Sequence, residues 1–244
     1  MSDVKIHKIA AMKMKKPLVV LGFPGTGLVG SVAASQIIEA LEMEFGGYIS
    51  SPEFAPLAAI HDYVPFPAAR IHFSKKHNII VILSEMSIPN SATLDLAEKL
   101  FEFAKGMSAS AIISLGGISA KEGKNDVYII SSDRKALQDL VKMKAAKPIK
   151  EGATTGVTGI LLAKGTLNHY PVTTLLAEAA EDYVDPQAAS NAIKVLSKMI
   201  GKKISTTMLD QEAVEKTKGL KEGMVQSKIP RRAAPGDEGG SMYG

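Results

Sequence analysis

The chain has 244 residues, of which 45% are hydrophobic, and a formal charge of +4 at pH 7. This length and apolar content suffice for one large domain, and the mild basic excess, mixed with glutamates, argues against nucleic-acid binding. Cysteine is absent, which excludes disulfides, thiolate metal sites and cysteine nucleophiles. No apolar run approaches the roughly 20 residues that span a bilayer. Residues 1–16 lack the apolar segment of a secretory leader, so we expect a cytoplasmic protein without a membrane partner.

The first predicted unit is a strand joined to a helix. Pro17 precedes a short apolar run at 18–22, which has the length and the flanking breakers of a buried strand. From Leu28 onward, apolar residues recur at helical spacing for about four turns. A glycine-rich turn connects the two elements, as in a βα unit.

Further strands follow along the chain. The runs at 79–83 and 111–115 are continuously apolar, as expected of central strands that are covered on both faces. The remaining strand predictions are 45–50, 57–63, 69–74, 127–131 and 172–178.

Two later helices carry clear start signals. Asn90 or Ser91 can cap the first helix. Asp185 and Pro186 are a typical N-cap and first-turn pair for the second helix, which Gly201 ends. The alternation of strands and helices predicts an α/β fold: a three-layer sandwich around a mostly parallel central sheet.

The chain is expected to divide into three parts: an α/β domain at 1–204, an exposed helical extension at 205–229 and a disordered tail at 230–244. The tail is rich in Pro, Gly and charged residues without apolar periodicity, so it cannot bury enough surface to offset the entropy of ordering. About twelve such residues have a root-mean-square span of roughly 20 Å. The tail can therefore search the surface of a partner.

The tail ends in Met242, Tyr243 and Gly244, a combination that suits docking into a pocket. The first two side chains supply apolar area, and the terminal carboxylate attracts a lysine or backbone amides. One short tail binds weakly, so useful affinity requires several tails on one oligomer. The alternative is a passive scaffold on which this ending is incidental.

Gly25, Gly27 and Gly30 match the pattern G-x-G-x-x-G between a strand and a helix, which is where a dinucleotide-binding loop occurs. The acidic residue that should close the next strand is missing, because Glu53 comes only after Pro52. We favour a glycine turn that lets the helix pack tightly or face a neighbouring subunit. A nucleotide- or nucleoside-binding enzyme that uses Gly25–Gly30, with Glu53 or Glu85, is the alternative function.

Polar residues near strand ends form a second group of candidates. Glu85 follows a buried strand, and His61, Asp62 and Arg70 lie near the ends of other strands, so a hydrolase-like or phosphorylase-like cleft is conceivable. Each of these residues is equally consistent with a surface or interface role. The five histidines form no H-x-x-x-H pair, so we predict no metal site and no cofactor.

Two proline-rich segments, 51–56 and 64–67, are also apolar. Phe54, Phe66 and Pro67 would suit a subunit interface if they are exposed. A buried loop is the alternative.

Five segments carry a resemblance to a known family: 22–30, 51–56, 114–117, 158–162 and 185–189. In this order they resemble the archaeal branch of the proteasome assembly chaperone family, over about residues 15–202. The resemblance implies a phosphorylase/hydrolase-like α/β sandwich without an established catalytic centre. It also implies a homo-oligomer, with a tetramer favoured.

The resemblance further implies a mode of binding. Some members end in a hydrophobic-Tyr-any-residue motif, which Met242, Tyr243 and Gly244 match, and in proteasome activators that motif enters pockets between the α-subunits of the core particle. Similar members act without ATP, and here Leu28 stands where a Walker-type loop would carry its lysine. We therefore expect a non-enzymatic, ATP-independent chaperone or activator that binds proteasome α-subunits.

Overall fold

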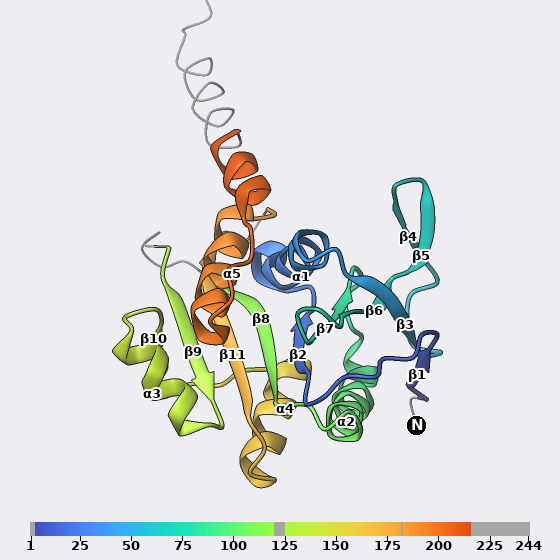
Figure 1. Ribbon diagram of the computed structural model, residues 1–244, viewed down its shortest axis with the longest axis horizontal. Helices are drawn as coiled ribbons and strands as arrows, with labels where there is room; N and C mark the ends of the chain where they lie inside the picture. The colour runs from blue at the N-terminus through green and yellow to red at the C-terminus, as the bar shows by residue number, and fades with distance from the viewer. Residues whose placement is uncertain (1–2, 120–124, 182, 216–244) are drawn as a thin grey trace, which may run out of the picture.

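The computed structural model describes residues 3–119, 125–181 and 183–215. Within these residues, a nine-stranded sheet forms the centre of the molecule (Figure 1). In spatial order its strands are β1 (Lys5–Lys8), β3 (Glu44–Ser50), β6 (Ala69–Ser74), β7 (Ile79–Ser84), β2 (Leu18–Gly22), β8 (Ala111–Ser119), β11 (Val172–Ala179), β9 (Val127–Ser131) and β10 (Lys147–Pro148).

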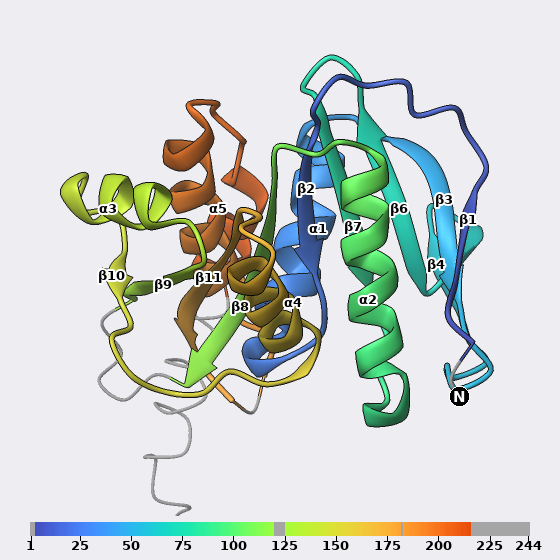
Figure 2. The same cartoon turned by 90° about the horizontal axis from the view of Figure 1, so that it is seen from below.

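Helices cover both faces of the sheet and make the three layers that the sequence predicts. The first face carries α1 (Val29–Ala40), α3 (Arg134–Lys142) and α5 (Pro186–Ile200), and the second carries α2 (Asn90–Gly106) and α4 (Gly156–Leu167) (Figures 1 and 2). Each face has its own apolar core. Because Val20 points into the first core and Val19 and Leu21 into the second, the run in β2 is apolar at every position.

The α/β class is confirmed, and the parallel arrangement holds for the four central strands β7, β2, β8 and β11. The strands next to this centre pair antiparallel with it, β6 with β7 and β9 with β11, whereas the short edge strand β10 pairs parallel with β9. A short turn joins β6 to β7, and two strands joined so closely can pair only in the antiparallel sense. The carboxyl ends of the four central strands meet at one edge of the sheet.

The predicted strand at 57–63 is wrong in extent. The structure has a separate two-stranded hairpin instead, in which β4 (Ala58–His61) turns at Asp62 and Tyr63 into β5 (Val64–Pro67). This hairpin projects from the body beside α1 and β3 (Figure 1). Sequence reasoning also missed α3 and α4, and Gly156, which opens α4, has a positive φ of 70°.

Residues 207–215 are helical, and Leu209 and Ala213 on this helix are buried. The predicted extension at 205–229 is therefore described only as far as 215. The predicted tail, with Met242, Tyr243 and Gly244, lies outside the described residues. Among the helices that are described, none is long and apolar enough to cross a membrane.

Candidate functional site

The glycine loop joins β2 to α1 through the short helix η1 (Thr26–Leu28). A Cβ atom on Gly30 would lie 2.6 Å from the carbonyl oxygen of Leu115 on β8, which is closer than such atoms approach. Gly27 has a φ of 62°, and a Cβ atom there would lie 2.7 Å from the Cβ of Ala179. Its carbonyl accepts a hydrogen bond of 2.9 Å from the amide of Asp185. Gly27 and Gly30 therefore approach protein atoms, which supports the tight-packing role.

Gly25 differs from the other two glycines, since no atom lies within 4 Å of the position that its Cβ would take. It lines a cavity of about 340 Å³ at the carboxyl ends of the central strands, beside the first turns of α2 and α4. Hydroxyl groups dominate the polar lining, and they come from Thr26, Ser87, Thr93, Ser114, Thr154, Thr155, Thr158 and Thr174.

The hydroxyl-lined cavity has the chemistry of a binding site rather than of acid/base catalysis. None of the described residues that line it is ionisable at neutral pH. Ser114 and Thr158 share a hydrogen bond of 2.8 Å. Sequence reasoning did not single out these hydroxyls, although Ser114 inside an apolar strand and the Thr154–Thr155 pair before Gly156 were signals.

The structure brings together three of the predicted polar candidates. Arg70 on β6 donates two hydrogen bonds, of 2.9 and 3.1 Å, to the carboxylate of Glu85, which follows β7. Nε2 of His61, at the end of β4, lies 2.8 Å from Glu85 Oε1 and 3.1 Å from Arg70 Nη2. The Arg70 side chain is only 5% exposed. These three residues link the β4–β5 hairpin to the sheet, and we call them the hairpin clamp.

Electrostatics in the hairpin clamp favour the ionised carboxylate. Burial alone would raise the pKa of Glu85, but the hydrogen bonds and positive charge of Arg70 and His61 outweigh burial and hold this pKa below its usual value. Each polar group in the clamp thus has a partner, which suits a structural link.

The other predicted acidic candidates make no hydrogen bond within the clamp. Glu53 accepts a 2.9 Å hydrogen bond from the hydroxyl of Ser91, at the start of α2. Asp62 occupies the hairpin turn. Glu53 and Glu85 therefore have different hydrogen-bond partners, and Gly25 lines a cavity that neither of them lines. The described residues also include no cluster of three side chains that could hold a metal ion.

A half-buried histidine that sequence reasoning did not single out lies beside the clamp. His72 on β6 packs against Phe45, with ring centroids 5.5 Å apart. Neither ring nitrogen makes a hydrogen bond of normal geometry with the described residues, although the backbone of Met43 is near. Burial, and then the charge of Arg70, lower the pKa of His72 to about 4, so this ring is neutral at physiological pH.

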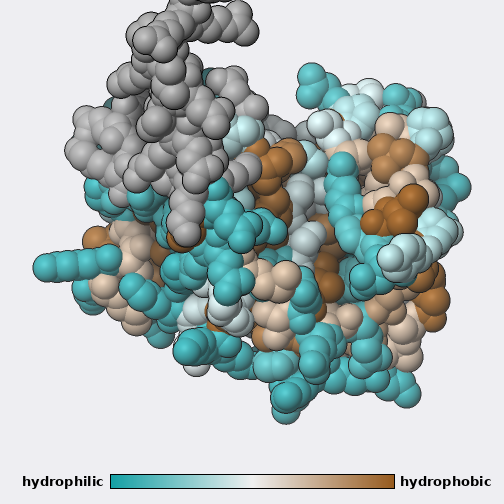
Figure 3. Space-filling model, turned by 90° about the horizontal axis from the view of Figure 1, so that it is seen from above, coloured by the Kyte–Doolittle hydropathy of each residue, from teal (hydrophilic) through white to brown (hydrophobic). Residues whose placement is uncertain are grey.

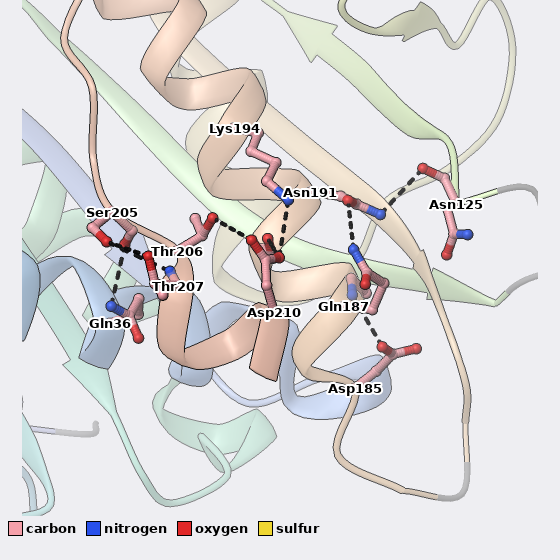
Figure 4. Close-up of polar contacts among 12 residues, drawn as sticks. Gln36, Asn125, Asp185, Gln187, Asn191, Lys194, Ser205, Thr206, Thr207 and Asp210 are labelled. Atoms are coloured by element: carbon pink, nitrogen blue, oxygen red, sulfur yellow. Dashed lines mark hydrogen bonds and ion pairs between the residues drawn. The ribbon is translucent and has the colours of Figure 1, made fainter. Parts of the chain in front are cut away.

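The helix at 207–215 is fixed to the body by a polar network (Figure 4). Asp210 accepts hydrogen bonds from Ser190 (2.5 Å), Lys194 (2.9 Å) and Thr206 (3.0 Å), and the first two of these lie on α5. On the other side, Gln36 of α1 donates to the carbonyl of residue 205 at 3.2 Å. Burial would raise the pKa of Asp210, but its hydrogen bonds and the charge of Lys194 lower it. The described part of the chain therefore ends on a helix that is fixed to the body.

Comparison with known proteins places this architecture in a family. A model of the PAC2 family matches residues 19–223. The chain belongs to the PAC2 family. The match covers the sandwich and the helix at 207–215, and it ends before Met242.

Two solved structures of PAC2-like proteins share the fold. PbaA of Pyrococcus furiosus, an archaeal homologue of a proteasome-assembly chaperone, is 28% identical, with a TM-score of 0.83 and 94% of each chain covered. PbaB of the same organism, an archaeal proteasome activator, is 23% identical, with a TM-score of 0.77 over 92% of this chain and all of that one. An uncharacterised protein of Methanocaldococcus jannaschii is 31% identical over 90% of both chains.

Proposed function

We propose that this PAC2 protein is a non-enzymatic, ATP-independent assembly chaperone or activator of the proteasome, and that it acts in the cytoplasm as a homo-oligomer, with a tetramer favoured. The observation that carries the proposal is the likeness to PbaA, with 28% identity and a TM-score of 0.83 over 94% of both chains. The satisfied hairpin clamp favours binding over bond chemistry, and so does the lack of ionisable groups among the described residues that line the hydroxyl-lined cavity.

The proposed contact with proteasome α-subunits runs through Met242, Tyr243 and Gly244. The fixed helix at 207–215 supports this role, because it sets the point from which residues 216–244 continue. Several copies of the tail on one oligomer would raise a weak single contact to a useful avidity. Tails that bind an open ring more tightly than a closed one would also shift the gate toward opening.

The test compares binding of purified proteasome α-subunits by full-length protein and by tail variants. We expect Tyr243→Ala, and deletion of 242–244, to lower the affinity at least tenfold and to leave the oligomeric state unchanged. Ser241→Ala is the matched control in the same tail and should bind normally. Addition of ATP should change none of these affinities. Undiminished binding by both tail variants would refute docking through these residues.

The hydroxyl-lined cavity supports a second candidate function, binding of a nucleotide, a nucleoside or another polar small molecule next to Gly25. Eight hydroxyl-bearing side chains line it, beside the first turns of two helices. Thr93 and Thr174 already donate to backbone carbonyls, and Ser114 shares a hydrogen bond with Thr158, so the other hydroxyls are the freer partners for a polar ligand. Calorimetry with NAD, adenosine and inorganic phosphate tests it. Saturable micromolar binding that Thr158→Val abolishes, and that Thr207→Val on the exposed surface preserves, would favour this function. Absence of heat with all three probes would eliminate those ligands.

A further inference from the structure

Lysines gather at one edge of the molecule, where the central strands have their amino ends. Four segments form this edge: 9–17 before β2, 75–78 before β7, 105–110 between α2 and β8, and 198–203 at the end of α5. They carry nine lysines, all of them exposed: Lys13, Lys15, Lys16, Lys75, Lys76, Lys105, Lys198, Lys202 and Lys203. We call this surface the basic edge. It faces the viewer in Figure 1 and becomes the lower rim in Figure 3, which is mainly hydrophilic.

The basic edge contains almost no negative charge of its own. Its four segments include no Asp or Glu. The acidic residues nearest to it along the sheet lie at its two ends, Glu42 and Glu44 at the start of β3 and Asp133 at the start of α3. The carboxyl-end edge of the same strands is the acidic one, with Glu178 and Glu181 at the end of β11. The formal charge of +4 therefore conceals a separation of charge between two edges.

The lysines of the basic edge have no anionic partner in the part of the chain that the structure describes. None of the nine forms an ion pair there, whereas Lys99 pairs with Glu102 and Lys194 with Asp210 on the sides of the helices. Like charges on one face repel each other and attract an oppositely charged molecule. An acidic partner would relieve this repulsion and would be steered to this edge.

Hydrogen bonds hold the segments of the basic edge in fixed positions. The side-chain amide of Asn78 donates to the carbonyls of Lys15 and Lys16, at 3.0 and 3.3 Å. The ammonium group of Lys202 donates to the carbonyl of His77 at 2.6 Å. Figure 2 shows the β6–β7 turn beside the segment before β2, at the top of the view. A surface that is already ordered loses little conformational entropy when it binds.

A pocket of about 280 Å³ opens within the basic edge. Its lining consists of exposed Lys16 and Lys202, the polar residues His77, Asn78 and Ser110, and the more buried apolar residues Leu18, Ile79 and Ile200. We call it the basic pocket. It combines an apolar floor with ammonium groups at its rim, and the described residues that line it include no carboxylate.

This combination suits an apolar side chain that is flanked by carboxylates. The floor offers apolar contact, and the ammonium group of Lys202 has two protons left for a partner after its bond to His77. Lys16 has a φ of 49°, a left-handed conformation that is uncommon for lysine, and such conformations concentrate at functional sites. A single-stranded nucleic acid fits less well, because the four segments contain no Phe, Tyr or Trp on which bases could stack.

We propose that the basic edge docks an acidic segment of another protein, with an apolar side chain of that segment in the basic pocket and its carboxylates on the surrounding lysines. This contact goes beyond the proposed function, since it uses the folded body instead of the tail. It assigns a second interaction surface to the chain, at the edge opposite to the hydroxyl-lined cavity.

Fluorescence anisotropy with purified full-length protein tests the surface. The probe is a labelled synthetic peptide in which one leucine is flanked on both sides by glutamates. We expect saturable binding that the double variant Lys16→Glu, Lys202→Glu weakens at least tenfold. Lys76→Glu, which changes a charge that makes no hydrogen bond within the protein, should weaken binding severalfold. Lys150→Glu is the matched control, because it makes the same charge change on the loop before α4, beside the carboxyl ends of the strands, and should bind as the wild type does.

Three further probes decide the class of partner. A peptide with glutamines in place of the glutamates should lose binding, and added salt should weaken the original contact. A peptide with serine in place of leucine should bind more weakly, and equal affinity would overturn the role of the basic pocket. Polyuridylate that binds more tightly than the acidic peptide would assign the edge to nucleic acid and overturn the proposal. Undiminished peptide binding by both the double variant and Lys76→Glu would overturn it as well.

The result is separate from that of the tail assay. Tyr243→Ala should bind the acidic peptide normally, because the proposed tail contact lies outside the basic edge. Loss of peptide binding in this variant would contradict an independent surface. Failure of the tail to bind α-subunits would leave the basic edge untouched.

Discussion

The glycine loop and the β4–β5 hairpin both change the direction of the chain, but they differ in the size of the residues at the turning points and in how tightly those residues are packed. In the loop, Gly27 and Gly30 leave no room for a side chain, because backbone and side-chain atoms of β8 and the β11–α5 connection fill the space. In the hairpin, Tyr63 occupies a left-handed position that suits glycine, yet its side chain meets only solvent. The loop therefore has its smallest residues where tertiary packing is tight, whereas the hairpin has a bulky residue where the described residues leave it exposed to solvent.

This difference shows that a glycine pattern and an apolar pattern are ambiguous until the space beyond each Cα is known. The same G-x-G-x-x-G spacing serves a cofactor in one fold and close helix packing in another. An apolar residue likewise belongs to a core or to an interface according to what surrounds it. Three predictions test the contrast between loop and hairpin.

The largest effect is expected from Gly30→Ala in the loop. The added methyl group would press on the carbonyl oxygens of Phe23 and Leu115, and neither backbone can retreat without disturbing β2 or β8. We expect the free energy of unfolding to fall by about 3 kcal/mol or more, the upper range for overpacking. Denaturation with urea measures the change.

Gly25→Ala is the control for this prediction, because a methyl group there meets no atom within 4 Å. Its φ of −172° is extended backbone that alanine also adopts. The free energy of unfolding should change by no more than about 0.5 kcal/mol. Equal losses for Gly25→Ala and Gly30→Ala would contradict the packing role of the loop.

An intermediate, pH-dependent effect is expected under the hairpin, whereas the loop from Gly22 to Gly30 contains no ionisable side chain. The pKa of His72 falls from an ordinary value of 6.5 to about 4 in the fold, so the unfolded chain binds the extra proton between these values. The contribution of the neutral ring to the free energy of unfolding is fully present above pH 6.5 and declines as the pH falls toward 4. The loss amounts to at most about 3 kcal/mol.

The free energy of unfolding, measured at pH 7 and at pH 4.5, gives the slope of stability against pH. The wild type should show this slope, and His72→Leu should lack most of it. His169→Gln, at an exposed turn, should keep the wild-type slope. The carboxylate of Glu85 stays ionised through most of this window because its pKa lies below its usual value of 4.5. A wild-type slope retained in His72→Leu would assign the pH dependence to another group.

The smallest effect is expected from Tyr63→Gly on the protein at low concentration. Glycine relieves a left-handed φ at a turn, so the free energy of unfolding should rise by about 0.5 to 1 kcal/mol. Thermal unfolding of dilute protein measures it. A clear loss of stability would mean that the tyrosine side chain supports the fold of its own chain, and would contradict the difference between the packed loop and the exposed hairpin turn.

The regular elements were largely predictable, because their signals are local. The apolar run of β2, the periodicity of α1 and the Asp185 cap of α5 each lie within a few residues, and all three are found. Helix α4 was missed because glycines at 156, 159 and 165 weaken its helical pattern, whereas neighbouring elements hold it in place. The predicted strand at 57–63 runs through the turn of the hairpin, and 64–67 was predicted as a proline-rich interface segment or loop, because Asp62 and Tyr63 are weak turn formers beside glycine.

The candidate sites were less predictable, since their residues come from distant segments. Arg70 and Glu85 are neighbours only through the antiparallel pairing of β6 and β7, and His61 joins them through the hairpin. The hydroxyl-lined cavity and the basic pocket combine segments that are up to about 190 residues apart along the sequence. Met242, Tyr243 and Gly244 stay a prediction from sequence alone.

By itself, the sequence determined the α/β class, most strand and helix positions and the resemblance to proteasome assembly chaperones, because hydrophobic periodicity and capping act over a few residues. Only the tertiary structure decided which glycines are tightly packed and which side chains of the hairpin are exposed. The role of a glycine depends on the atoms that another strand places beyond it, and the role of an apolar side chain depends on whether any surface of its own chain covers it. Both are properties of how distant segments meet.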